Sequence, residues 1–466
     1  MFWRTKIMRK LLLVFLIFTF CCIGVLFITS LFILRTVITE SPETSFYNPS
    51  NSFLPTNLDD TMKSPVYLKE ISDIKNDFIS ESKNFLEINF SEMEVRLYQE
   101  GKLIKEVPIL AVGDPQSWGG SAAGLYKIMS GNKLSFSIVS EVYMPYALRY
   151  YGKYYLHGEP YYPGGEKLIS SVSGGCIRLS DKDAKDIYEL TELDMPVLVI
   201  DKEKDYYQYP NKKLSDFPEI SAESYLVADL DSGFVFAEKN SDEKLPIASL
   251  AKLMTALVVA ENVDLRKSML VEPEMLQVYG TTQGLEAGKR FRVVELFYPL
   301  LIESSDDAAE VLGYFLGRGK TIKMMNEKTK AILMGNTEFV DLRGFDAKNV
   351  STARDLFHLA RYILNNRPPL LEITKGKQVR SFGEVRFNVK DFWNENVFID
   401  DPSFVGGKTG YLPQSKYTGI FIFKFLTEDE KTRDIVIILL GSEDNQTDTQ
   451  KIYKWLLENY QKLTIK

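Results

Sequence analysis

The sequence predicts a multidomain chain, in which a transmembrane helix precedes a β-rich domain and then an α/β domain built from an antiparallel sheet with helices. Three observations predict this class. The 466 residues allow about three units at roughly 150 residues each. Residues 11–34 carry no charge, and the pattern of apolar residues changes near residues 85 and 220. Hydrophobic (45%) and charged (26%) fractions are ordinary for a folded protein, which excludes a largely disordered or fibrous chain.

Charge and scarce residue types exclude several functions. The net charge of −7 argues against a general nucleic-acid binder. The chain has three cysteines (Cys21, Cys22, Cys176) and two histidines (His157, His358). This set cannot supply a zinc site of the usual type or a disulfide framework, and we expect neither a metal nor another cofactor. His358 lies in a predicted helix without a pattern of partner residues, and we interpret it as structural.

The uncharged run from Leu11 to Leu34 is long enough to cross a bilayer core as a helix. A cleaved signal peptide is the alternative, but its apolar core is shorter and ends at a small-residue cleavage site. Four basic residues precede the run, so residues 1–35 are predicted to form a cytoplasmic N-terminus and a membrane anchor. Everything later would lie outside, where Cys176 is the sole cysteine and is either an inert core thiol or a reactive one.

The exported chain divides by composition. Residues 36–84 are rich in Ser, Asn, Pro and charge, and predict a stalk. Residues 85–200 contain short apolar stretches separated by turn signals, which predict a β-rich domain. The predicted strands include Phe85–Phe90, Val95–Tyr98, Val107–Val112 and Val197–Ile200. Residues 201–219, with prolines, tyrosines and many charges, predict a linker.

Residues 220–466 combine both periodicities and predict the α/β domain. A hairpin is predicted at Ser224–Asp229 and Gly233–Ala237, and two late strands at Tyr417–Phe425 and Arg433–Leu440. The predicted helices are Ala248–Val259, Val293–Leu301, Asp306–Leu316, Ile322–Leu333, Thr352–Asn365 and Thr447–Tyr460.

One histidine and one cysteine form the first candidate site. Cys176 lies 19 residues after His157 and directly follows Gly174 and Gly175. A thiol attacks a carbonyl as thiolate, so it needs a neighbouring imidazole to take its proton. Glycines beside the nucleophile let backbone amides approach the developing oxyanion. A structural cysteine and a surface histidine are the alternative for either residue alone, but the whole pattern favours a cysteine nucleophile.

Residues from about Asn84 to Ile200 resemble the L,D-transpeptidases of the YkuD type. That family carries His-Gly, a spacer, and Ser-His-Gly-Cys followed by an apolar residue and Arg, which the sequence here largely matches. The resemblance implies that Cys176 is the nucleophile and His157 the general base. It also implies that the backbone amides of Gly175 and Cys176 hold the oxyanion.

Two further positions of this motif carry less certain roles. By the resemblance, Arg178 organises the loop or meets a substrate carboxylate, and a structural ion pair is the alternative. Gly174 stands where the family usually has His, so an auxiliary hydrogen-bonding group is missing. This departure concerns the rate more than the type of reaction.

A serine and a lysine at i and i+3 form the second candidate site. Ser-x-x-Lys occurs five times, but only Ser249 opens an apolar helix after a proline, so that Lys252 can reach its hydroxyl. The start of that helix also offers an amide to an oxyanion. Ser304-Ser305-Asp306 and Lys408-Thr409-Gly410 follow in the order expected for penicillin-binding serine enzymes.

The stretch from about Ile220 to Tyr460 resembles the D-alanyl-D-alanine carboxypeptidases. The resemblance implies that Ser249 forms the acyl-enzyme, Lys252 activates it and Ser304 relays a proton. Lys408 and Thr409, followed by Gly410, would hold the substrate carboxylate, and the amides of Ser249 and Tyr411 would form the oxyanion hole.

Asp306 departs from the Asn that is usual in this family. A carboxylate cannot donate the hydrogen bond that an amide gives, and beside Lys252 it favours the ammonium form, which is a poorer base. Lys408 acts in the opposite direction. A domain that binds stem peptides but hydrolyses them slowly or not at all therefore remains an alternative.

The sequence thus predicts a bifunctional peptidoglycan enzyme in the bacterial cell membrane, with one membrane pass through Leu11–Leu34. Its two catalytic domains, residues 85–200 (the first head) and 220–466 (the second head), would both face the cell wall. Its expected partners are stem peptides, and we expect acylation by β-lactams and no nucleic acid. The alternatives are a binding protein with an inactive head and a serine endopeptidase that cuts existing cross-links.

Overall fold

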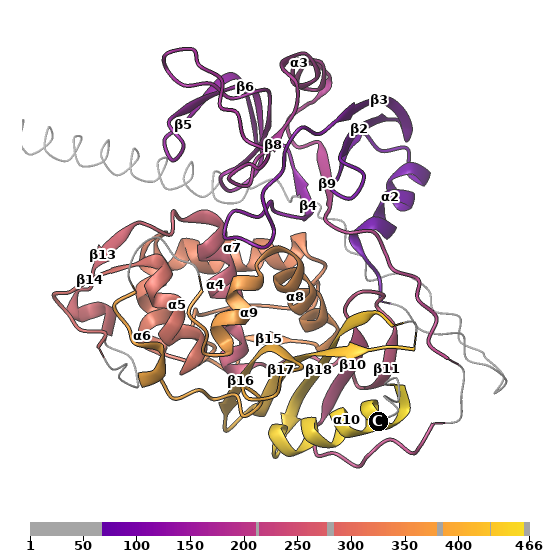
Figure 1. The fold of residues 1–466 in the computed structure, drawn as a ribbon, viewed down its shortest axis with the longest axis vertical. Helices are drawn as coiled ribbons and strands as arrows, with labels where there is room; N and C mark the ends of the chain where they lie inside the picture. Colours follow the sequence, from indigo (N-terminus) through magenta and orange to yellow (C-terminus); the bar gives the residue numbers. More distant parts are fainter. Residues whose placement is uncertain (1–67, 211–213, 277–283, 380–384, 429, 461–466) are drawn as a thin grey trace, which may run out of the picture. The chain divides into compact units, whose positions relative to one another are not determined.

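The computed structural model describes residues 68–210, 214–276, 284–379, 385–428 and 430–460 (Figure 1). The predicted membrane span and most of the predicted stalk lie outside these residues. Among the helices of the described part, none combines the length and the hydropathy that a bilayer crossing requires.

The β-rich domain contains two sheets. The five-stranded sheet has the order β3-β2-β1-β9-β4, and the four-stranded sheet has the order β5-β6-β7-β8. β1 is central, pairs antiparallel with β2 and parallel with β9, and is buried throughout. The strands of the first sheet are β1 (Phe85–Asn89), β2 (Glu94–Gln99), β3 (Lys102–Pro108), β4 (Gly124–Lys127) and β9 (Pro196–Ile200). The second sheet and its helix are β5 (Ser130–Ser137), β6 (Val142–Tyr151), β7 (Tyr154–His157), β8 (Ile177–Arg178) and α3 (Asp181–Leu190).

One helix lies inside the segment predicted as a stalk. This helix, α2 (Ile71–Ser80), buries Ile74 and Phe78, which lie one turn apart on a single face. Both side chains pack with Phe85 and Leu198 in a small apolar cluster under the first sheet. The folded region therefore begins before residue 84, because this short helix has a face that the sheet can bury.

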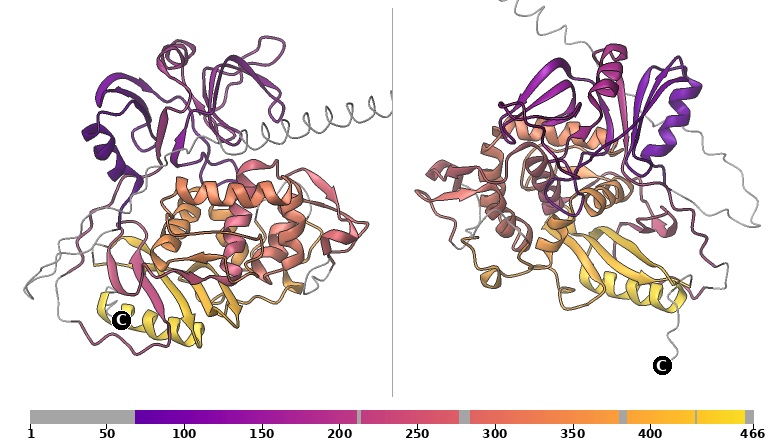
Figure 2. Two further views of the ribbon diagram at one scale, coloured as in Figure 1. Left: turned by 180° about the vertical axis from the view of Figure 1, so that it is seen from behind. Right: turned by 45° about the horizontal axis from the view of Figure 1, so that its top comes forward.

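The α/β domain is organised around one antiparallel sheet of order β11-β10-β18-β17-β16. β18 runs through its centre, and alternate residues face opposite sides. Ile435, Ile437 and Leu439 pack with helix α10, whereas Val436 and Ile438 join the core under the other helices. Figure 2 shows α10 on one face of the sheet and the remaining helices on the other. The two-sided burial explains the continuous apolar run in this strand.

The predicted hairpin, late strands and helices lie within a few residues of the observed bounds, whereas strands β12 to β16 and helix α9 were not predicted. The strands are β10 (Ser224–Asp229), β11 (Val235–Lys239), β12 (Leu245–Pro246), β13 (Ser268–Leu270), β14 (Arg290–Arg292), β15 (Val350–Ser351), β16 (Phe404–Leu412), β17 (Lys416–Leu426) and β18 (Thr432–Ser442). The helices are α4 (Ala251–Asn262), α5 (Val293–Ile302), α6 (Asp306–Tyr314), α7 (Arg318–Ala331), α8 (Ala353–Asn366), α9 (Pro368–Thr374) and α10 (Asn445–Tyr460). Short 3₁₀ turns span Ala248–Leu250, Pro273–Leu276 and Val389–Asp391.

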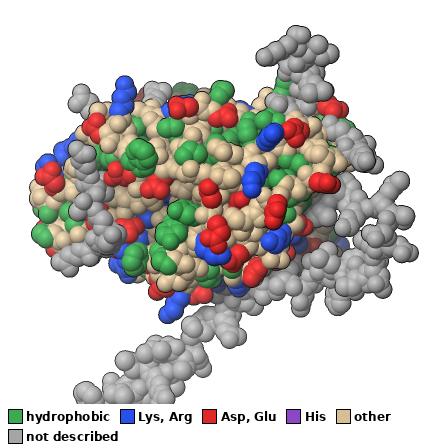
Figure 3. Space-filling view, turned by 90° about the horizontal axis from the view of Figure 1, so that it is seen from below, with side chains coloured by type: hydrophobic (Ala, Val, Ile, Leu, Met, Phe, Trp, Pro, Cys, Tyr) green, Lys and Arg blue, Asp and Glu red, His purple; other side chains and the backbone are tan. Residues whose placement is uncertain are grey.

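The described residues between the two domains, 201–210 and 214–219, contain no helix or strand. They make hydrogen bonds and an ion pair with the second domain. Tyr209 donates a hydrogen bond to Asp229 at 2.7 Å, and Asp205 pairs with Arg433 at 2.6 Å. The two domains also share one hydrophobic cluster, in which side chains of both are buried together. On the face drawn in Figure 3, acidic and basic side chains are interspersed.

Candidate active sites

The parallel pairing of β7 and β8 brings the first candidate residues to neighbouring positions. His157 ends β7 and pairs in register with Arg178 of β8, and Cys176 directly precedes β8. Residues 176 and 178 are two apart, so in extended chain their side chains leave the same side. The fold therefore brings histidine, cysteine and arginine to one end of the four-stranded sheet.

His157 is held as a neutral base. Its side chain is buried, and Nδ1 lies 2.6 Å from the carbonyl oxygen of Gly158. That contact is a hydrogen bond only when Nδ1 carries the proton, which leaves a lone pair on Nε2. The pKa of His157 is lowered to about 4, mainly by burial and to a lesser extent by the Arg178 charge, while the hydrogen bond to Gly158 opposes both. The imidazole is consequently uncharged at neutral pH and has a free acceptor nitrogen.

Cys176 is partly buried and is not hydrogen-bonded to His157 in this structure. Its thiol donates to the carbonyl oxygen of Lys153, with the sulfur 3.8 Å from that oxygen. Burial raises the pKa of Cys176, although the Lys153 and Arg178 charges oppose this effect. The thiol is therefore protonated at rest, and its activation requires a base.

The loop before Cys176 has a fixed backbone. Gly175 has φ +117°, and a Cβ at that position would lie 2.6 Å from the Tyr154 ring, so only glycine fits. Its amide donates to Ser173 Oγ at 3.0 Å, and Ser173 Oγ in turn donates to the carbonyl of Cys176. Gly174 differs, because a Cβ there would meet no atom within 4 Å. No steric reason for glycine exists at the position where the family usually has His.

Arg178 is buried and donates to the carbonyl oxygen of Ser170 at 2.9 Å. This contact joins β8 to the loop that leads to the nucleophile. No ion pair involving Arg178 is found among the described residues. This contact fits a role of Arg178 in organising the loop, which is one of the two roles that the resemblance implies.

The second candidate site assembles at the start of α4. Ser249 lies in the 3₁₀ turn Ala248–Leu250, and α4 begins two residues later. Lys252 is 1% exposed and donates to Ser249 Oγ at 2.8 Å, to the carbonyl oxygen of Arg343 at 2.9 Å and to Asp306 Oδ1 at 2.7 Å. These three acceptors match the three hydrogens of an ammonium group.

Burial and the local charges oppose each other at Lys252. Burial lowers its pKa, and this effect outweighs the nearby Asp306 carboxylate, which raises it. Asp306 opens helix α6 and lies 3.7 Å from the Arg343 guanidinium as well. The carboxylate is therefore shared by two cations, which weakens its hold on the lysine proton.

Strand β16 carries the late motif past the serine. A Cβ at Gly410 would lie 2.7 Å from the Ser249 amide nitrogen, so glycine allows the strand to pass Ser249 closely. Lys408 is buried and donates to the carbonyl oxygen of Thr409 at 2.8 Å. Burial, assisted by the Lys252 charge, lowers the pKa of Lys408 to about 7. Tyr411, by contrast, is exposed and its ring packs on Tyr417.

Two hydroxyls of this region are buried without a hydrogen-bond partner, namely Ser304 Oγ and Thr409 Oγ1. Ser304 also adopts φ +61°, an uncommon conformation for a residue with a side chain. Unpaired buried hydroxyls cost free energy unless a ligand satisfies them. Both sit in motifs predicted to handle substrate or protons, and both are available to a bound molecule.

The loop at Asp341–Asp346 contributes to the site and was not predicted. Asp341 accepts hydrogen bonds from the backbone amides of Arg343, Gly344 and Asp346 at 2.8, 2.6 and 2.8 Å. This turn places the Arg343 carbonyl at Lys252. Gly344 has φ +79°, and a Cβ there would collide with the Ala248 carbonyl oxygen. An aspartate and a glycine predict a turn, but the sequence gives no signal that the turn reaches Lys252.

Comparisons with known proteins match two families, and their matches meet between residues 199 and 211. Residues 211–440 match the family model of the D-alanyl-D-alanine carboxypeptidases, and residues 83–199 match that of the L,D-transpeptidase catalytic domain. The chain is 32% identical over 212 residues to a D-alanyl-D-alanine endopeptidase of Haemophilus influenzae, covering 44% of this chain and 70% of that protein. It is 26% identical over 266 residues to the D-alanyl-D-alanine carboxypeptidase DacC of Escherichia coli, covering 53% and 64%.

Among solved structures, the chain is similar to penicillin-binding protein D2 from Listeria monocytogenes in its cefotaxime-bound form. The identity is 27% and the TM-score 0.43, over 52% of this chain and 99% of that one.

Proposed function

Because the chain belongs to the D-alanyl-D-alanine carboxypeptidase family and carries an L,D-transpeptidase catalytic domain before that part, we propose that it is a two-headed enzyme acting on peptidoglycan stem peptides. The observation that carries the proposal is the contact of Lys252 Nζ with Ser249 Oγ at 2.8 Å. It places a buried lysine, whose pKa is lowered, within reach of a hydroxyl at the start of a helix.

In the second head, Ser249 Oγ attacks the carbonyl between the last two D-alanines of a stem. Its proton passes to the neutral amine of Lys252, and the oxyanion is held by the amides of Ser249 and Tyr411. The C–N bond breaks, and D-alanine leaves with a proton relayed through Ser304. Water then hydrolyses the acyl-enzyme.

The carboxylate of the departing residue needs its own site. Lys408 offers an ammonium group and Thr409 an unpaired buried hydroxyl, which together match a carboxylate.

In the first head, Cys176 attacks the carbonyl at the third stem residue after giving its proton to Nε2 of His157. The transfer requires the two side chains to come within hydrogen-bond distance. D-alanine leaves, and the acyl group passes from sulfur to an amine of a neighbouring stem. The two reactions suit a series, because the tetrapeptide left by the carboxypeptidase head is the acyl donor for the other.

A head that only binds stem peptides is the second candidate for the α/β domain. The contact of Lys252 with Asp306 at 2.7 Å favours it, because an ion pair stabilises the protonated lysine. Acylation separates the two proposals. We expect benzylpenicillin to add its mass to Ser249 and a carbapenem to add its mass to Cys176, each lost in the corresponding alanine variant. Absence of the Ser249 adduct would leave the binding role.

Endopeptidase action on existing D,D cross-links uses the same serine chemistry. Digestion of cross-linked dimers beside free pentapeptides distinguishes it, since a carboxypeptidase releases D-alanine only from the free stems.

The uncharged segment Leu11–Leu34 supports an anchor in the bacterial cell membrane, with the heads outside. We expect protease added to intact spheroplasts to degrade both heads. Protection of the heads would place them in the cytoplasm.

A further inference from the structure

A buried ion cluster joins the two domains. Glu261, at the end of α4, pairs with Lys328 of α7 at 2.9 Å and with Arg367 at 3.1 Å, and all three side chains are fully buried. Tyr362 also donates its hydroxyl to Glu261. Two cations thus share one carboxylate inside the second domain, and the remaining donors need partners elsewhere.

Those partners are tyrosines of the first domain. Lys328 Nζ donates to the Tyr126 hydroxyl at 2.8 Å and lies 4.8 Å from the centre of the Tyr151 ring. Arg367 donates to the Tyr154 hydroxyl at 2.6 Å. Each cation of the cluster is therefore completed by an aromatic side chain from across the interface.

Tyr154 links this cluster to the nucleophile loop. It begins β7, the strand that ends at His157, and its ring lies where a side chain at Gly175 would have to go. Gly175 directly precedes Cys176. The contacts run from Glu261 through Arg367 and Tyr154 to Gly175, the residue before Cys176.

The neighbouring residue makes a second connection. Lys153 Nζ donates to the carbonyl oxygen of Val263 in the second domain at 3.1 Å. The carbonyl oxygen of the same lysine accepts the hydrogen bond from Cys176. Lys153 and Tyr154, which are adjacent in the chain, are thus both hydrogen-bonded to the α/β domain.

We propose that Arg367 of the carboxypeptidase-type domain is a positioning residue for Cys176, acting through Tyr154, so that the first head depends on the second for its geometry. This inference rests on the proposed role of Cys176. It goes beyond a hand-over of product, because it requires no chemistry at Ser249.

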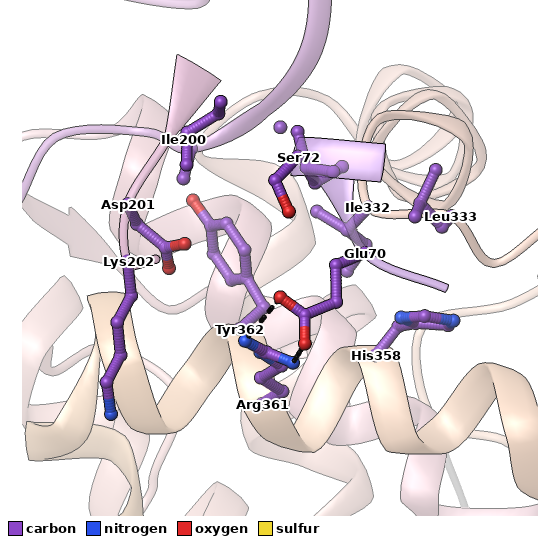
Figure 4. Close-up of a pocket in the computed structure, with 13 residues that line it drawn as sticks. Glu70, Ser72, Ile200, Asp201, Lys202, Ile332, Leu333, His358, Arg361 and Tyr362 are labelled. Carbon is purple, nitrogen blue, oxygen red and sulfur yellow. Dashed lines mark hydrogen bonds and ion pairs between the residues drawn. The ribbon is translucent and has the colours of Figure 1, made fainter. Parts of the chain in front are cut away.

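A second buried ion pair between the domains offers a matched control for the Arg367 contact. Figure 4 shows Glu70, which precedes α2, against Arg361 on α8, and the two pair at 2.6 and 2.9 Å. This pair is also buried and also joins the domains, and no hydrogen bond or ion pair among the described residues links it to Cys176, Gly175 or Tyr154. We expect loss of the Glu70–Arg361 pair to loosen the interface between the domains without moving the loop before Cys176.

The test uses the full chain in detergent micelles, with Tyr154→Phe, Arg367→Lys and Glu70→Gln. Acylation of Cys176 by a carbapenem is followed in a Ser249→Ala background, and acylation of Ser249 by benzylpenicillin in a Cys176→Ala background. Alkylation of Cys176 by iodoacetamide, located by peptide mass spectrometry, reports access to the thiol alone.

We expect Tyr154→Phe and Arg367→Lys to slow the carbapenem reaction about tenfold or more, because small misplacements of a nucleophile cost that much. Alkylation should rise several-fold as the thiol leaves its buried contact, and Ser249 acylation should stay within about twofold. Glu70→Gln should match the parent in all three. An unchanged carbapenem rate in both variants would overturn the proposal, as would an equal loss in Glu70→Gln.

The two proposals fail differently. A parent chain that the carbapenem never acylates contradicts the proposed chemistry of Cys176. The alkylation rates then still decide the positioning, because a rise in Tyr154→Phe but not in Glu70→Gln supports it, and no rise overturns it.

Discussion

We expect Asp306 to be the residue that most directly limits the second head. Its carboxylate lies 2.7 Å from Lys252 and is shared with Arg343. An amide in the same place would remove one charge from the pair and could donate a hydrogen bond to substrate. The sequence was sufficient to identify this departure, and the structure adds the competing guanidinium.

We expect Asp306→Asn to raise the rate of D-alanine release from pentapeptide by about tenfold, because a larger fraction of Lys252 is then the neutral amine that can accept a proton. The rise of activity with pH should also move to lower pH, since loss of the carboxylate lowers the lysine pKa further. Release is measured by mass spectrometry across pH, with Asp264→Asn, which removes the partly buried partner of Arg266, as control. An unchanged rate would mean that Asp306 does not restrain the lysine.

The pKa of Lys408 leads us to expect a loss of activity on the high-pH side of the profile. Burial and the Lys252 charge hold its pKa at about 7, so its ammonium group is present below that pH and lost above it. We expect kcat/KM for a D-alanyl-D-alanine substrate to fall roughly tenfold per pH unit above about pH 7. In Lys408→Arg, the guanidinium stays charged and the fall should disappear. A fall that persists in this variant would assign it to another group.

At the scale of elements, the strongly patterned segments were predicted well and the context-dependent ones were not. β17, β18 and α8 lie within a few residues of their predicted bounds because their apolar residues repeat at strand or helix spacing. Helix α2 was missed because only Ile74 and Phe78 of its residues are buried. Its stability comes from packing on the sheet, which a polar, irregular sequence does not reveal.

Phe78→Ala should therefore lower the free energy of unfolding by about 3 kcal/mol, as expected for a buried aromatic ring. The ring contacts Phe85 at a centroid distance of 5.3 Å and is 2% exposed. Ile79→Ala on the exposed side of the same helix is the control, and urea unfolding measures both. Equal, small effects would mean that α2 does not belong to the folded core.

At the scale of the whole molecule, the union of the domains could not be predicted. Each half of the chain carries its own motif, so the sequence predicts two independent sites joined by a linker. The ion cluster arises from Glu261 on α4, Lys328 on α7 and Arg367 between α8 and α9. Its other members are tyrosines more than a hundred residues away. Charged residues within helices normally predict a solvent-facing surface, and only the fold shows that these are buried.

Glu261→Gln should destabilise the two domains together, because it leaves two buried cations without their shared carboxylate. We expect a loss of about 3 to 5 kcal/mol in the free energy of unfolding. Urea unfolding measures it, and Glu286→Gln, at an exposed pair with Lys289, is the control. Separate unfolding of the two domains at unchanged midpoints would contradict a joint core.

Pentapeptide muropeptides fed to the chain show whether the two heads act in series on one stem peptide. Products are followed by mass spectrometry for the parent, Ser249→Ala and Cys176→Ala. The parent should give tetrapeptide and then cross-linked dimer, Cys176→Ala should stop at tetrapeptide, and Ser249→Ala should give neither. A cross-link yield from pentapeptide that is unchanged in Ser249→Ala would contradict the account.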